Sequence, residues 1–68
     1  MMTRLKEMRK NRGLTLAQLA LRSRVDEAFL SKLERSLKTA HSEMQERIAG
    51  VLETSPIELF RRDGMPRE

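Results

Sequence analysis

Basic side chains that could bind a phosphate gather in the first third of the chain. The protein has 68 residues and a formal net charge of +4. Residues 1–25 carry seven basic side chains against one acidic side chain, Glu7, so residues 26–68 sum to −2. The basic positions are Arg4, Lys6, Arg9, Lys10, Arg12, Arg22 and Arg24. A basic end on a small domain indicates either an anionic partner, most often a nucleic acid, or a solubilising surface.

The residue types that usually carry catalysis or bind metals are scarce in this sequence. There is no cysteine, which excludes disulfides and thiolate ligands, and His41 is the only histidine. No paired carboxylates, no nucleophile with a base and no glycine-rich phosphate loop are recognisable. The sequence therefore predicts a protein that is not an enzyme and has no metal or cofactor. The absence of cysteine fits a cytoplasmic location, and no apolar run is long enough to span a membrane.

Start and stop signals predict five short helices, at residues 3–12, 15–22, 26–36, 42–52 and 55–61. Helix N-caps are expected at Thr15, Asp26, Ser42 and Ser55. Gln18, Gln45 and Glu58 stand where they would complete capping boxes. No stretch alternates with a period of two, so we expect an all-α fold without a sheet. The predicted domain covers residues 1–61, and residues 62–68 are expected to form a flexible C-terminal tail.

The second and third of these helices are separated by a tight turn. Ala20 is small enough for the third helix to cross closely over the second, and Val25 fills the turn. Leu30 and Leu33 then seat the third helix on the core. This arrangement leaves the outer face of the third helix free to enter a groove.

Landmark residues along the chain have the spacing of a known family. They are Arg4–Glu7, Gly13–Thr15, Leu19–Ala20, Val25, Leu30–Ser31, Glu34–Arg35, Ile48–Ala49, Leu52 and Glu58–Phe60. Across residues 4–60 the sequence resembles the phage-repressor and Cro-like (Xre-type) helix-turn-helix family. The resemblance implies a compact five-helix repressor-like bundle, with helices two and three as the helix-turn-helix. It also implies a sequence-specific DNA-binding transcriptional regulator, most often a repressor, acting as a homodimer.

The resemblance assigns roles to individual residues. The helix at 26–36 would lie in the major groove of double-stranded DNA, with base contacts from Glu27, Ala28 and Lys32. Phosphate contacts would come from Thr15, Leu16, Arg35 and Lys38. Family members pair an arginine late in helix one with a glutamate late in helix three, which implies a structural ion pair between Arg9 and Glu34.

Apolar residues late in the chain predict the homodimer interface. A domain of this size is marginally stable, and burying apolar side chains across a two-fold axis would add stability. The interface residues expected from the sequence are Val51, Leu52, Ile57 and Phe60.

Several positions depart from the family pattern and support an alternative function. Leu16 replaces a usual glutamine, Phe29 a small polar residue, and Leu37 a polar or basic residue. Together they predict an exposed apolar patch of the kind that often marks protein contacts. The alternative is thus a protein-interaction module on the same fold, an antirepressor or antiactivator. Arg24 replaces the usual glycine of the turn, so we also expect a positive φ there.

Overall fold

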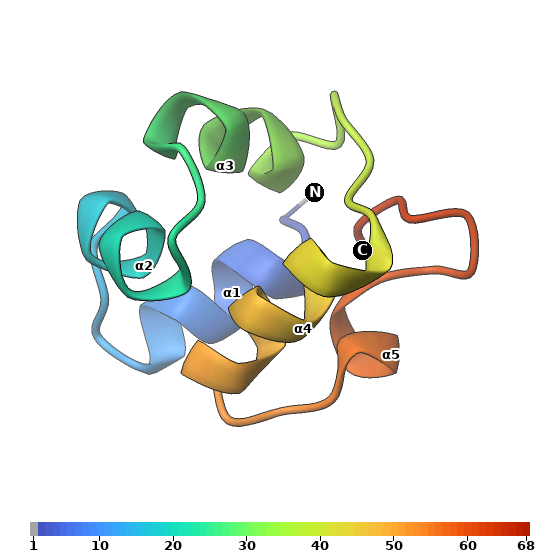
Figure 1. Cartoon of the computed structure of the whole chain (residues 1–68). Helices are drawn as coiled ribbons and strands as arrows, with labels where there is room; N and C mark the ends of the chain where they lie inside the picture. The colour runs from blue at the N-terminus through green and yellow to red at the C-terminus, as the bar shows by residue number, and fades with distance from the viewer. Residues whose placement is uncertain (1) are drawn as a thin grey trace.

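Five α-helices surround one core in the computed structural model, which describes residues 2–68 (Figure 1). They are α1 (Arg4–Asn11), α2 (Leu16–Ser23), α3 (Glu27–Glu34), α4 (Ser42–Val51) and α5 (Pro56–Leu59). Helix α4 packs against α2 and α5, α2 packs against α3, and α1 packs against α5. The predicted all-α architecture is confirmed. The described residues contain no strand, only one isolated bridge between Phe60 and Pro66.

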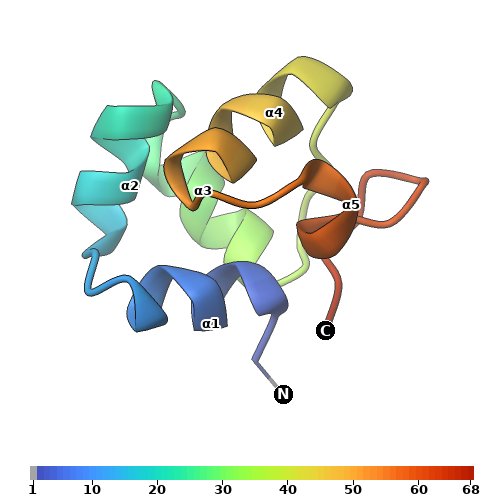
Figure 2. The ribbon, with the colours of Figure 1, turned by 90° about the horizontal axis from the view of Figure 1, so that it is seen from below.

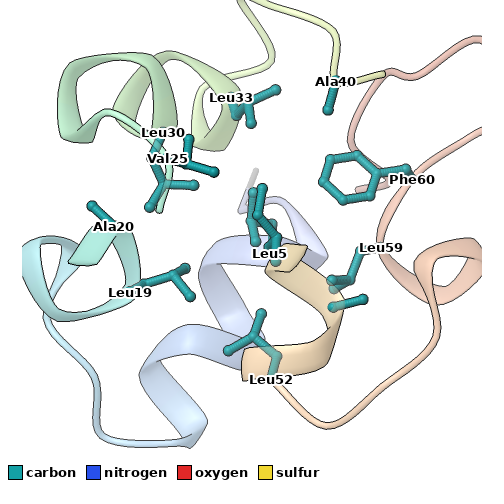
Figure 3. Packing of buried hydrophobic residues seen from close by; sticks show 12 residues of the cluster. Leu5, Leu19, Ala20, Val25, Leu30, Leu33, Ala40, Leu52, Leu59 and Phe60 are labelled. Atoms are coloured by element: carbon teal, nitrogen blue, oxygen red, sulfur yellow. The ribbon is translucent and has the colours of Figure 1, made fainter. Parts of the chain in front are cut away.

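Every helix contributes a fully buried aliphatic side chain to the core (Figure 3). The buried positions that represent the five helices in order are Leu5, Leu19, Leu30, Ile48 and Leu59. Leu33 adds a second contact from α3, and Phe60 lies directly after α5 with 2 % of its surface exposed. Burying side chains of this size stabilises the fold by about 1.5–3 kcal/mol each. Because α3 contributes both Leu30 and Leu33 to this core, their burial holds α3 against the rest of the domain.

Four helices begin with a side-chain cap that accepts from one of the free amides at the helix start, and the first three are α1, α2 and α3. Thr3 Oγ1 accepts from the Lys6 amide at 3.2 Å at the start of α1. Thr15 and Gln18 form the predicted capping box of α2, with hydrogen bonds of 2.8 and 3.0 Å. Asp26 Oδ2 accepts from the Phe29 amide at 3.1 Å at the start of α3. The N-caps predicted at Thr15 and Asp26 are confirmed.

The capping box predicted for α4 at Ser42 is wrong. The N-cap is His41, whose backbone is extended and whose Nδ1 accepts from the Met44 amide at 3.4 Å. Gln45 instead donates from Nε2 to the Ala40 carbonyl at 2.7 Å. Because Ser42 already has helical geometry, its hydroxyl stands one position too late to cap the helix. Ser55 is the N-cap residue of α5, as predicted, but its side chain makes no capping hydrogen bond, and α5 begins on the proline at its first position.

Each of the first four helices is followed, one or two residues after its end, by a residue with positive φ. These residues are Gly13 (φ 70°), Arg24 (58°), Ser36 (60°) and Glu53 (57°). After α2, the amide of Val25 donates to Ala20 O at 3.1 Å and that of Arg24 to Leu21 O at 3.4 Å, the pattern of a Schellman motif. The positive φ expected at Arg24 is confirmed. A non-glycine residue in this conformation costs about 1 kcal/mol.

Residues 60–67 form a C-terminal hairpin that lies next to the N-terminal end of α1 (Figure 2). The Arg61 amide donates to Met65 O at 2.7 Å, and the Arg67 amide donates to Leu59 O at 2.8 Å. The Arg4 amide then donates to Arg67 O at 2.8 Å, which satisfies the first amide of α1.

The hairpin also contacts the segment that precedes α4. Gly64 is buried, and its carbonyl accepts from the Ala40 amide at 3.0 Å. Pro66 is buried as well. The structure thus differs from the flexible tail expected at residues 62–68. The hairpin is held mainly by main-chain hydrogen bonds, which side-chain periodicity does not reveal.

Candidate nucleic-acid interface

The two helices that the sequence singles out, α2 and α3, lie side by side with α3 at the edge of the molecule (Figure 1). Ala20 on α2 is 7 % exposed and Val25 in the turn is 5 % exposed. Leu30 and Leu33 are fully buried, as expected for the face of α3 that meets the core. The geometry is that of a helix-turn-helix with a rigidly seated second helix.

The turn is held from outside by Arg47 on α4, a residue that sequence reasoning missed. Arg47 Nε donates to Ser23 O at 3.0 Å, and Nη2 reaches Arg24 O at 3.5 Å. Only the pairing of Arg47 with Glu43 one helical turn earlier, at 3.5 Å, could have been expected from spacing. Ser23 is buried, and its hydroxyl keeps a hydrogen-bond partner because it donates to Leu19 O at 2.7 Å.

The end of α3 is clamped to α1 by Arg9 and Glu34, which the structure brings together. Arg9 Nε lies 2.6 Å from Glu34 Oε2 and Nη2 lies 3.0 Å from Oε1, a bidentate pair. The side chains are only 11 % and 5 % exposed. Arg9 Nη1 also donates to Leu14 O at 2.9 Å, and Thr3 Oγ1 donates to Glu34 O at 3.1 Å. The donors and acceptors of this buried pair are therefore well matched.

The outward face of α3 carries the residues expected to contact bases. Glu27, Ala28 and Lys32 are all exposed. Arg35 and Lys38 follow on the loop after α3 and are exposed too. Within residues 2–68, Lys32, Arg35 and Lys38 form no ion pair, so their charges are available to an anionic ligand.

The start of α2 offers amides rather than side chains to a phosphate. Thr15 is exposed, but its hydroxyl and its amide are both engaged in the capping box. Leu16 packs partly against the core and carries no polar group. The first amides of a helix have no intrahelical acceptor, so any phosphate contact at Leu16 would come from its main chain.

The residues expected to form an apolar patch do not gather on the surface. Leu16 and Phe29 are partly buried against the core, and only Leu37 is well exposed, at 59 %. The patch predicted from the sequence is therefore reduced to a single side chain.

Two of the residues expected at the dimer interface belong to the core of the single chain. Leu52 is fully buried and Phe60 is 2 % exposed, so neither has surface left for a partner. The assignment of Leu52 and Phe60 to an interface is corrected for this reason. Ile57 is 67 % exposed and Val51 is partly buried.

Other kinds of site find no support in the part of the chain that the structure describes. Residues 2–68 contain no group of three or more metal-ligating side chains. None of the helices formed by these residues is both long and apolar enough to cross a membrane.

The family model that describes the helix-turn-helix domain matches residues 3–61. The chain belongs to this family. The matched range contains all five helices and both members of the Arg9–Glu34 clamp. The predicted helix-turn-helix family and the repressor-like bundle are thus confirmed. No curated protein matches the sequence closely.

Solved structures of bacterial regulators resemble this helix-turn-helix domain. The SinR protein/SinI protein complex matches at 34 % identity and TM-score 0.77, covering 88 % of this chain and 59 % of that one. The clp gene regulator ClgR from Corynebacterium glutamicum matches at 37 % identity and TM-score 0.75, covering 79 % and 57 %. SinR, the master regulator for biofilm formation, matches in complex with DNA at 36 % identity and TM-score 0.73, covering 79 % of this chain and 87 % of that one. The N-terminal DNA binding domain of SinR from Bacillus subtilis matches with the same identity and TM-score, covering 79 % and 80 %. The domain therefore spans less than two thirds of the first two matched chains.

Proposed function

We propose that this helix-turn-helix domain binds DNA as a sequence-specific transcriptional regulator, with α3 in the major groove. The observation that carries the proposal is the division of α3 into two faces. Leu30, Leu33 and Glu34 are buried against the rest of the domain, whereas Glu27, Ala28 and Lys32 are exposed. A helix seated in this way presents a fixed set of side chains to base edges. The likeness to SinR, which is solved in complex with DNA, supports the proposal.

Each exposed side chain of α3 matches a different base edge. A lysine such as Lys32 donates to guanine, a glutamate such as Glu27 accepts from cytosine N4, and the methyl group of Ala28 contacts thymine. Arg35 and Lys38 would contact phosphates and supply affinity without sequence preference.

We propose further that the regulator acts as a homodimer. Ile57 is the large exposed side chain among the four residues expected at the interface, and Val51 is partly exposed. To read two half-sites one turn of DNA apart, the two copies of α3 in this dimer would have to lie about 34–36 Å apart. Sedimentation at micromolar concentration should show twice the chain mass, and Ile57→Asp should return it to a monomer.

Selection of bound sequences from random duplex DNA tests the function directly. With the selected site in hand, Lys32→Ala should weaken binding by about 1–3 kcal/mol and relax the preference at one base pair. Arg35→Ala should weaken binding to all sequences alike and lower the salt slope by about one unit. Lys10→Ala on α1 removes the same charge from an exposed site and serves as the control. No enrichment of any sequence, together with salt-independent behaviour, would refute the proposal.

The protein-interaction module is the second candidate, and the exposed Leu37 is the observation in its favour. SinR is also solved in a complex with the SinI protein. Under this alternative, Leu37→Ser abolishes binding to a protein partner, while Lys32→Ala and Arg35→Ala change little.

A further inference from the structure

The two ends of α3 are held in place by arginines from two different helices. At the C-terminal end, Arg9 of α1 binds Glu34 in the buried bidentate pair described above. At the N-terminal end, Arg47 of α4 binds the turn that leads into α3. Glu27 is the first residue of α3, whereas Lys32 lies in its last turn. The two arginines therefore hold parts of the helix that carry different proposed base contacts.

The first turn of α3 has no fully buried side chain of its own. Glu27 and Ala28 are exposed, and Phe29 is only partly buried. Leu30 and Leu33, which follow, are fully buried. The first four amides of a helix have no acceptor within it, so the geometry of this turn depends on the segment that precedes it.

The segment that precedes α3 depends on Arg47 for the hydrogen bonds of two carbonyl groups. Arg47 Nε donates to Ser23 O at 3.0 Å, and Nη2 reaches Arg24 O at 3.5 Å. No other group among residues 2–68 donates to either carbonyl. Ser23 is 1 % exposed, so without Arg47 its carbonyl would have no partner unless the turn moved to admit water.

The guanidinium group of Arg47 is engaged within the domain. Its third nitrogen, Nη1, lies 3.5 Å from Glu43 Oε2 on the preceding turn of α4, and the side chain is 26 % exposed. Each of the three nitrogens therefore has a partner in the domain itself. An arginine engaged in this way acts on DNA binding through the turn that it holds rather than through a phosphate.

We propose that Arg47 is a positioning residue for base recognition, which fixes the first turn of α3 so that Glu27 and Ala28 meet their base pairs. The inference rests on the proposed DNA-binding function and adds to it a residue of α4, outside the helix-turn-helix, that determines sequence preference. Lys32 does not depend on Arg47, because the buried ion pair with α1 holds its part of the helix. Helix α3 thus contacts DNA with two parts that are positioned separately.

Sequence selection from random duplex DNA, carried out with variants of the full chain, tests the proposal. Arg47→Met keeps a long side chain but removes every donor, whereas Arg47→Lys keeps the charge and a donor for Ser23 O. Arg47→Met should lower discrimination on the order of three- to tenfold at the base pair whose preference Glu27→Ala relaxes. It should leave unchanged the preference that Lys32→Ala relaxes, and Arg47→Lys should restore most of the loss. The salt slope should remain that of the parent, because no phosphate contact is removed.

Double variants separate positioning from a general loss of stability. Adding Arg47→Met to Glu27→Ala should have little further effect at the base pair that Glu27 contacts, whereas its effect should add to that of Lys32→Ala. Gly64→Ala is the control for destabilisation elsewhere, since a Cβ there would lie 2.8 Å from Ala40 O in the C-terminal segment. It should leave both preferences unchanged. Circular dichroism at the binding temperature checks that each variant is folded, and Arg47→Gln, which keeps a neutral donor, replaces Arg47→Met if that variant is not.

The outcomes distinguish a failure of this inference from a failure of the proposed function. If the parent chain binds DNA and Lys32→Ala behaves as expected, but Arg47→Met relaxes no preference or relaxes every base pair alike, the inference is overturned and the function stands. It is overturned as well if Glu27→Ala relaxes no preference. A salt slope lowered by about 0.9 in Arg47→Met, beyond the change in Lys10→Ala, would show that Arg47 contacts a phosphate itself and would also overturn it. If the parent chain binds no DNA at any salt concentration, both fail.

Discussion

Two of the long-range joints that close this fold use different chemistry. Between α1 and α3, the joint is a buried bidentate ion pair between Arg9 and Glu34. Between the C-terminal hairpin and the segment before α4, it is a main-chain hydrogen bond from Ala40 to Gly64. The first joint positions the helix proposed to read bases, and the second holds the C-terminal hairpin against the segment before α4. A contact made by side chains can be recognised in the sequence from two distinctive residue types. A contact made by main-chain atoms is marked in the sequence by a glycine at most.

The largest effect should come from breaking the charged joint. Arg9→Ala and Glu34→Ala should each lower the free energy of unfolding by about 3–5 kcal/mol, because each leaves its partner charged and buried. Chemical denaturation of the purified variants measures this. Arg4→Ala is the control, since the Arg4–Glu58 pair is exposed and 3.7 Å long, and it should cost about 1 kcal/mol or less. Equal losses in all three variants would show that burial is not what makes the Arg9–Glu34 pair important.

Breaking the main-chain joint should have the next largest effect. Gly64 has φ +88°, and a Cβ there would lie 2.8 Å from Ala40 O. Gly64→Ala should therefore cost about 1–3 kcal/mol through backbone strain and displacement of the hairpin. Gly50→Ala is the matched control: it lies within α4 with open space around it and should add up to about 1 kcal/mol. If Gly64→Ala is as stable as the parent in a thermal melt, the hairpin does not contribute to the fold.

The turn between α2 and α3 combines both kinds of chemistry, because a side chain there binds main-chain carbonyls. Arg47→Ala should lower the free energy of unfolding by about 1–2 kcal/mol by removing the donor to Ser23 O. Glu46→Ala, exposed on the same helix, should change it little. Urea titration distinguishes the two variants. A loss no greater for Arg47→Ala than for Glu46→Ala would mean that the turn holds itself.

The smallest effect should be a gain in stability at the helix ends. Arg24→Gly and Ser36→Gly should each raise stability by a few tenths to about 1 kcal/mol, since both positions have φ near 60°. Arg22→Gly, within α2, should instead cost up to about 1 kcal/mol. Differential scanning calorimetry resolves shifts of this size. A clear loss in Arg24→Gly would show that its side chain contributes more than its backbone conformation costs.

The sequence was sufficient to predict the parts of the molecule that depend on side-chain type and local spacing. The capping box at Thr15, the buried plug at Val25 and the positive φ at Arg24 are all local or follow from a turn of fixed length. The family resemblance adds Arg9 and Glu34, which the structure places in contact although they are 25 residues apart. The residue types at these positions are distinctive enough to be recognised without coordinates.

Other features could not be predicted because their cause lies in the arrangement of the whole chain. The hairpin depends on carbonyl and amide groups that every residue possesses, so nothing in residues 62–68 identifies it. Ser42 fits a capping box as well as many true N-caps do, and only the placement of α4 gives that role to His41. Leu52 and Phe60 are apolar in a way that suits an interface or a core equally, and packing decides between the two.

The hydrogen bond from the Arg4 amide to Arg67 O joins the first residue of α1 to the last residues of the C-terminal hairpin. Closing so long a loop is entropically costly, so this bond should form late in folding and open early. We expect the two ends to open as one cooperative unit. The amides of Arg4 and Arg67 should then exchange with solvent deuterium at matching rates, well ahead of Leu30 in the core. The ends of this chain would thus share one local unfolding equilibrium rather than fray independently.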